Sequence, residues 1–220
     1  EDVGRGTTNI NRSDTLSIRA KLLIQPSDEF SLKLTYWRNE TDSIWDNISA
    51  VKNSPEKNFT GVDGDPIGFQ RPDFTILAGY ASYDLGFATI ENSLSHYKSQ
   101  VPARFVIGIP GAPFGTLIVD TFDDSKALTD EFRIVSNGDT AFQWVAGVFY
   151  RDASQVRAFS GGYETLPLPS SYPLIQSKSI SFFGEASYGF ADDRIRLLVG
   201  GRYFRDNRSF MQTTEGLLTD

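Results

Sequence analysis

The stretch from Lys178 to Arg205, KSISFFGEASYGFADDRIRLLVGGRYFR, alternates apolar and polar side chains on both sides of a short turn. Every second position on one side is apolar or small: Ile180, Phe182, Gly184, Ala186 and Tyr188 before the turn, and Ile195, Leu197, Val199, Gly201 and Tyr203 after it. Alternation with a period of two indicates a β-strand with one apolar face. Two such strands joined by the turn Phe190-Ala191-Asp192-Asp193 predict an antiparallel hairpin.

The same pattern occurs three more times in the chain. Hairpins are predicted near residues 15–37, 74–98 and 128–151, and the one near 178–205 is the fourth. Their turns include Asp84-Leu85-Gly86 and Asn137-Gly138, and Asn-Gly is a strong turn signal. The chain is therefore predicted to form about eight strands in four hairpins, each strand close to the roughly 9–11 residues that a tilted strand needs to cross a bilayer.

The segments between the hairpins are long and rich in proline. Residues 38–73, 99–126 and 152–177 hold nine of the ten prolines, a residue that is disfavoured in paired strands. One end of the sheet is thus predicted to have short turns and the other long loops, an asymmetry typical of outer-membrane barrels with periplasmic turns and extracellular loops. The predicted fold is all-β, an antiparallel transmembrane β-barrel segment, and aromatic residues near both strand ends fit the two girdles of such barrels.

Composition excludes several other classes of protein. The 220 residues contain no cysteine and carry a net charge of −7, so a disulfide framework and a nucleic-acid partner are not expected. The single histidine, His96, cannot form a typical transition-metal site, and the sequence has no G-x-S-x-G motif. Two acidic groups, Asp63 with Asp65 and Asp120 with Asp123 and Asp124, match no complete Ca²⁺ loop. We predict no enzyme activity, no cofactor and no metal.

Two other folds share the alternating pattern. A soluble β-sheet protein that binds a ligand with its loops predicts that the apolar faces of two sheets pack against each other. A small standalone outer-membrane barrel predicts that the first strand pairs with the last. Strand length and the difference between turns and loops favour a piece of a larger barrel wall.

Several stretches resemble the barrel of TonB-dependent outer-membrane receptors. These are Phe183-Gly184-Glu185-Ala186, Asp193-Arg194-Ile195, the "G-x-R-Y" strand within 200–206, the strand pair 131–136 and 142–150, and the turn Tyr83-Asp84-Leu85-Gly86. The resemblance extends from Asn11 to Phe210. It implies a middle portion of the barrel domain over residues 1–220, without the N-terminal plug, the TonB box or the last strand of the family.

The resemblance also implies a function. Receptors of this family import ferric siderophores, cobalamin or saccharides through a plugged barrel of 22 strands, with energy delivered by TonB. The expected role is therefore uptake of a scarce solute, most simply a ferric siderophore, at the bacterial outer membrane. The expected partners are outer-membrane lipid, the plug and remaining barrel strands, the TonB complex through those other parts, and a small ligand such as an iron chelate.

Two groups of side chains are candidates for function. If the apolar face meets lipid, the opposite face lines the lumen and carries Arg19, Lys21, Lys33, Glu131, Arg133, Glu185, Arg194, Arg196 and Arg202. These charges contact the plug or a passing solute, or they are simply solvated. The predicted extracellular loops offer aromatic side chains for a ligand, or for packing of the loops against each other: Trp45, Phe69, Phe105, Phe114 and Tyr163.

Overall fold

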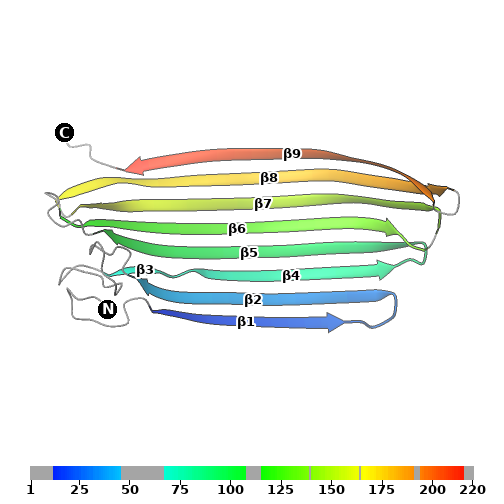
Figure 1. Ribbon diagram of the computed structural model, residues 1–220, viewed down its shortest axis with the longest axis horizontal. Helices are drawn as coiled ribbons and strands as arrows, with labels where there is room; N and C mark the ends of the chain where they lie inside the picture. Colours follow the sequence, from blue (N-terminus) through cyan, green and yellow to red (C-terminus); the bar gives the residue numbers. More distant parts are fainter. Residues whose placement is uncertain are drawn as a thin grey trace.

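The computed structural model describes residues 12–45, 67–107, 115–138, 140–163, 165–190 and 194–215, which form one antiparallel sheet (Figure 1). Its strands are β1 (Ser13–Ile24), β2 (Phe30–Trp45), β3 (Gly68–Gln70), β4 (Asp73–Asp84), β5 (Ala88–Ile107), β6 (Leu117–Ser136), β7 (Phe142–Tyr163), β8 (Leu166–Phe190) and β9 (Ile195–Glu215). No helix long and apolar enough to cross a membrane occurs in these residues.

The sheet follows the order of the chain, with β1 and β9 at its two edges. β3 and β4 both lie between β2 and β5, and they are separated only by Arg71 and Pro72. Proline has no N–H group to donate to a neighbouring strand, which explains the break. Over the described ranges β1 and β9 do not pair with each other, so the closure predicted for a small standalone barrel is absent there.

The predicted hairpin pairing and turns agree with the structure, but the strands are longer than predicted at the loop end. The hairpin predicted near 128–151 extends over 117–163, and the one near 178–205 extends over 166–215. The segments predicted as long loops around 99–126 and 152–177 are therefore mostly strand, and only Glu164 and Thr165 separate β7 from β8. Prolines enter these strands, and Pro169 lies where the β7–β8 register shifts by one residue.

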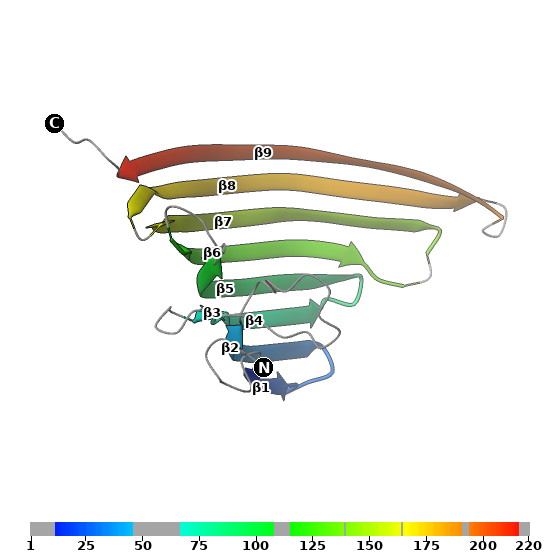
Figure 2. The ribbon, with the colours of Figure 1, turned by 60° about the vertical axis from the view of Figure 1, so that its left-hand side comes forward.

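The strands are staggered as the wall of a barrel requires. A row of directly paired residues that starts at Phe30, the first residue of β2, reaches Gly201 on β9, six residues after the first residue of that strand. Both ribbon views show the strand ends on the turn side stepping outward from β1 to β8 (Figure 1 and Figure 2). A shift of about one residue at each step, with a rise of about 3.3 Å per residue and about 4.8 Å between strands, corresponds to a tilt of about 35°.

The two faces of the sheet differ in chemistry. The register places Leu22, Leu34, Leu77, Leu128 and Phe182 on the same side of the sheet. We call this side the apolar face. Most of the exposed large hydrophobic side chains lie there, and Leu77 is 51% exposed. Among the described residues the buried hydrophobic side chains are only Ala88, Ala103 and Val106. The sheet has no core of its own, in contrast to the two packed sheets of a soluble β-protein.

Candidate functional site: the polar face of the sheet

The register places the charged residues predicted for the lumen on one face. Arg19, Lys21, Lys33, Glu131, Arg133, Glu185, Arg196 and Arg202 lie on the face opposite the apolar face, which we call the polar face. Arg194 lies in the turn directly before β9. Because side chains alternate along a strand, the period-two pattern alone is enough to assign these residues to a common face. That this face lines a lumen remains a prediction.

A cluster of four side chains, the Glu91 cluster, crosses β4, β5 and β6 on the polar face, near the turn end of these strands. The carboxylate of Glu91 on β5 accepts a hydrogen bond from the Tyr80 hydroxyl of β4 at 2.9 Å and is paired with the Arg133 guanidinium of β6. Glu131 lies 3.8 Å from the same guanidinium. Together with Ser93 these residues line a pocket of about 260 Å³. Arg133 and Glu131 were predicted from the sequence, whereas Glu91 and Tyr80 were not.

The Glu91 cluster carries two carboxylates, one guanidinium and one hydroxyl. The Glu91 side chain is 18% exposed, whereas that of Arg133 is 43% exposed, so the pair is only partly withdrawn from solvent. Lys33 places its ammonium group 5.5 Å from the centre of the Tyr80 ring. The cluster thus offers both hydrogen-bond donors and charged acceptors to a polar partner.

Aromatic side chains cover the polar face beside β1. Arg19 lies over the Trp37 ring at 5.5 Å, and the indole N–H of Trp37 donates to Ser17 Oγ at 3.1 Å. Phe74 meets Trp37 edge to face, with 5.0 Å between the ring centres. Arg19 is therefore held by a cation–π contact. Arg19 is also exposed to solvent, so its contact with a plug or a solute stays a prediction.

Asp123 forms several hydrogen bonds on the polar face, nearer the loop end of the strands than the Glu91 cluster. Its carboxylate accepts hydrogen bonds from Gln155 at 3.1 Å, from Ser125 at 2.9 Å and from the Arg157 Nε at 2.9 Å. Burial raises the pKa of Asp123, but these hydrogen bonds and the charge of Arg157 outweigh burial and hold the pKa below its usual value. Gln155 and Arg157 lie on β7, so Asp123 ties β6 to β7.

Small residues of β8 lie beneath larger neighbours on the polar face. Ser177, Ser179 and Ser181 are buried, and Ser181 is fully covered. The Arg202 Nε lies 3.1 Å from Ser181 Oγ, and Ser177 donates to Asp206 at 2.8 Å. Sequence reasoning assigned Arg202 to this face but missed the serines. A run of serine at every second position was the signal that could have revealed them.

The aromatic residues predicted as loop contacts lie on strands instead, as far as the structure describes them. Trp45 ends β2, Phe69 is in β3, Phe105 is in β5 and Tyr163 ends β7, while Phe114 lies outside the described residues. The register puts Phe105 and Tyr163 together on the loop end of the polar face, because Phe105 pairs with Val119, Val119 pairs with Gly161, and Tyr163 is two residues further along β7.

Phe69 is on the other face and is engaged by two arginines. The guanidinium groups of Arg71 and Arg104 lie 4.5 Å and 5.8 Å from the centre of its ring. Arg104 in turn makes a bidentate pair with Asp120, at 2.7 Å and 2.9 Å. Phe69 therefore holds Arg71 and Arg104 on the apolar side of the sheet, and contact with a ligand stays a prediction.

The acidic residues considered for Ca²⁺ point to different faces. Asp120 and Asp124 share the apolar side of β6, beyond its apolar band, whereas Asp123 is on the polar face. Asp124 accepts a hydrogen bond from Gln100 at 2.9 Å, and Asp120 is paired with Arg104. In the described ranges no three His, Cys, Asp or Glu side chains gather into a potential metal site. Asp63 and Asp65 lie outside those ranges.

Comparison with solved structures identifies a similar fold. The chain is similar to the ferric yersiniabactin uptake receptor FyuA from Yersinia pestis, with a TM-score of 0.76 and 14% sequence identity. The match covers 97% of this chain and 36% of FyuA, so the chain spans about a third of that receptor's length. The sequence matches no known family profile, and no curated protein sequence is similar enough to register as a match.

This likeness defines the class of fold. The described residues form an all-β antiparallel sheet similar to the barrel of an outer-membrane receptor, which confirms the fold class predicted from the sequence. At 14% identity the comparison speaks for the fold alone.

Proposed function

We propose that this chain is part of the barrel wall of a TonB-dependent outer-membrane receptor that takes up a scarce solute, most simply a ferric siderophore. The observation that carries the proposal is a single staggered sheet with an exposed apolar face and an opposite face held by ion pairs and hydrogen bonds. Soluble monomers rarely expose a contiguous apolar patch larger than a few hundred Å². Contact with the hydrocarbon core of a membrane would cover this apolar face.

The position of the apolar band supports the same proposal. On β4 and β5 the band includes Tyr83, Leu77 and Leu94, and it gives way to Lys98 and Gln100 toward the loop end. The strands continue well past this boundary, because β5 contains 20 residues and β8 contains 25. About ten residues of a tilted strand span the bilayer, so the remaining length projects from the membrane on the loop side.

The proposal assigns the polar face to the lumen. The Glu91 cluster lies at the depth of the apolar band and is the part of the wall that meets a plug, whereas Phe105 and Tyr163 lie near the outer opening. Iron chelates are often aromatic or charged. The Glu91 cluster offers charged contacts, and Phe105 and Tyr163 offer aromatic contacts. The likeness to a ferric yersiniabactin receptor is in line with an iron chelate as the solute.

Fluorescence quenching tests the membrane orientation. This chain contains no cysteine, so single cysteines at Leu77 and at its neighbour Ala78 can be introduced into the full-length protein, with any other cysteine replaced, and labelled. In bilayers whose acyl chains carry a quencher, we expect strong quenching at position 77 and weak quenching at position 78, because the two side chains lie on opposite faces. Equal quenching at both positions would falsify the lipid-facing assignment.

Uptake in living cells tests the solute. The full-length protein is expressed in a bacterium that lacks its own siderophore receptors, and accumulation of labelled iron from a panel of ferric siderophores is measured. We expect uptake of at least one chelate, and we expect that uptake to disappear in a strain without TonB. Uptake of cobalamin or a saccharide in place of every iron chelate contradicts the siderophore assignment but leaves the receptor proposal standing.

A further inference from the structure

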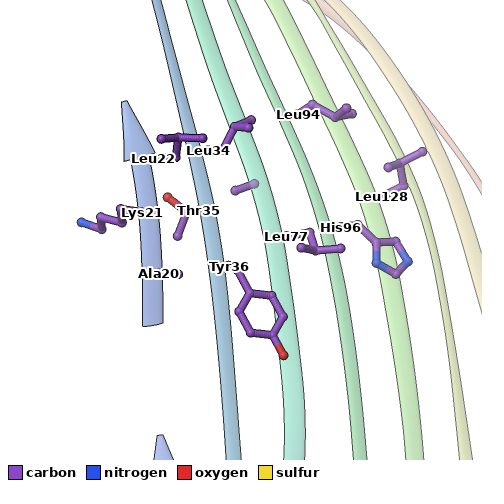
Figure 3. Close-up of a pocket in the computed structure, with 12 residues that line it drawn as sticks. Ala20, Lys21, Leu22, Leu34, Thr35, Tyr36, Leu77, Leu94, His96 and Leu128 are labelled. Carbon is purple, nitrogen blue, oxygen red and sulfur yellow. The ribbon is translucent and has the colours of Figure 1, made fainter. Parts of the chain in front are cut away.

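A groove crosses the apolar face above Gly79. It has a volume of about 460 Å³ and is walled by the side chains of Leu22, Leu34, Leu77 and Leu94, with Leu128 and His96 at one end (Figure 3). Gly79 directly pairs with Leu34 on one side and with Leu94 on the other, so the missing side chain leaves a hollow between two leucines. The volume falls within the roughly 300–1,000 Å³ of typical ligand sites.

Two lysines stand directly opposite each other at the loop-side rim of the groove. Lys98 follows His96 on the apolar side of β5, and it pairs in register with Lys126 of β6, which precedes Leu128 on the same side. Like charges directly opposite each other on neighbouring strands repel and destabilise the pairing. In the described part of the chain neither lysine forms an ion pair with a carboxylate.

The nearest carboxylates on this face are already engaged by other groups. Asp124 accepts from Gln100 at 2.9 Å, Asp152 is paired with Lys178 at 2.9 Å, and Asp73 is paired with Arg38 at 3.0 Å. Asp130, deeper on β6, accepts from Asn92 at 2.7 Å. Lys178 and Arg38 offset the charge of two of these carboxylates, whereas Asp124 and Asp130 accept only from uncharged amides. The Lys98 and Lys126 ammonium groups nevertheless stand directly opposite each other next to an apolar hollow, and an anion placed between them relieves their mutual repulsion.

From this arrangement we infer that the groove and the two lysines form a binding site for an acylated lipid with an anionic phosphate headgroup. The acyl chain lies in the hollow over Gly79, and the phosphate bridges the Lys98 and Lys126 ammonium groups at the membrane surface. Long lysine side chains reach the headgroup region readily, because their methylene chains tolerate apolar surroundings. This inference rests on the proposed function, since the groove meets lipid only if the apolar face lies in the bilayer.

Lipid retention by the full-length protein tests the inference. The protein is solubilised with mixed phosphatidylglycerol and phosphatidylcholine, and bound lipids are counted by native mass spectrometry. We expect about a tenfold preference for phosphatidylglycerol, lost when Lys98 and Lys126 are both changed to glutamine. The matched control is Lys178→Gln, which removes a lysine from the same face that already has Asp152 as its partner. Loss of the preference in the control alone, or no preference in the unaltered protein, overturns the inference.

A second variant separates the groove from the charges. Gly79→Leu places a side chain in the hollow of about 460 Å³, and its Cβ would be in ordinary van der Waals contact with Leu34 Cδ2 at 3.5 Å. We expect this variant to retain fewer phosphatidylglycerol molecules while both lysines are intact. Glycerol phosphate, the soluble headgroup, should compete poorly, and effective competition would indicate a free-phosphate site and overturn the lipid assignment.

The quenching measurement at Leu77 distinguishes the two ways of failing. If Leu77 is quenched by lipid-borne quencher but phosphatidylglycerol is not preferred, the lipid site is wrong and the proposed function stands. If Leu77 is not quenched, the membrane orientation itself is wrong and the lipid site is wrong with it.

Discussion

Phe183 of β8 lies directly over Gly147 of β7, its partner across the strand pair, and fills the space where a side chain at position 147 would be. A Cβ added to Gly147 would lie 2.5 Å from Phe183 Cζ and 2.8 Å from the carbonyl oxygen of Phe132. The first contact can be relieved by moving the ring, but the second involves the backbone of β6. The glycine therefore permits close packing of three strands beside Arg133.

The first prediction concerns this close approach. Gly147→Ala should lower the free energy of unfolding of the full-length protein in lipid vesicles by about 1–3 kcal/mol, because overpacking displaces a ring and a backbone segment. Urea titration followed by tryptophan fluorescence measures the change. Gly201→Ala is the control, since an added Cβ there meets no atom within 4 Å and the effect should stay within about 0.5 kcal/mol. Equal losses in both variants would contradict the packing explanation.

The second prediction concerns the Glu91 cluster. A double-mutant cycle with Glu91→Gln and Arg133→Met should give a coupling of about 1–3 kcal/mol, because the two groups are in direct contact and Glu91 is mostly withdrawn from solvent. The same cycle on Arg12 and Asp14, which are 3.1 Å apart and 54% and 73% exposed, should give about 0–1 kcal/mol. A Glu91–Arg133 coupling no larger than that of the control pair would show that the cluster does not hold the wall together.

The third prediction concerns a polar pair within the apolar band. Asn92 donates to Asp130 at 2.7 Å, and both lie on the apolar face next to Leu94 and Phe132. Asn92→Leu leaves the carboxylate without this donor and should destabilise the protein in vesicles by about 1–3 kcal/mol. Replacing both residues by leucine should recover most of the loss. If the double variant is no better than Asn92→Leu, the face around Asp130 is hydrated and not in contact with lipid.

The sequence predicted the turns and the two faces well because both depend on local chemistry. Gly86 and Gly138 have φ of +86° and +84°, values that favour glycine, and they lie in the turns expected between the strands. The alternation of apolar and polar residues assigned Arg19 and Arg133 to one face without knowledge of the partner strands. Alternation within one strand does not depend on the register, and matching the apolar side of each strand to that of its neighbour excludes registers slipped by one residue.

The strand ends and the contacts could not be predicted in the same way. Pro102 and Pro173 favoured loops, yet both lie within paired strands, although neither has an N–H group to donate to a neighbour. The partner of Arg133 is Glu91, 42 residues earlier in the chain. That choice depends on the register between β5 and β6, which the turn sequence at Asn137 does not determine.

The fourth prediction concerns acid sensitivity at the loop end. Because hydrogen bonds hold the folded pKa of Asp123 below its unfolded value near 4, the charged carboxylate contributes stability at pH values above that unfolded value. This contribution is lost as the pH falls through the folded pKa, where the carboxylate takes up a proton and its bonds from Gln155 and Arg157 weaken. Hydrogen exchange should then accelerate at the loop ends of β6 and β7 between pH 5 and pH 3 by more than the intrinsic change.

Two variants make the test of acid sensitivity specific. Asp123→Asn should exchange faster at neutral pH and respond less to acid, since it has no charge to lose. Asp28→Asn, in the turn between β1 and β2 at the opposite end of the sheet, should behave like the unaltered protein in this region. If Asp123→Asn keeps the full acid response, Asp123 does not control the acid-induced opening of these strands.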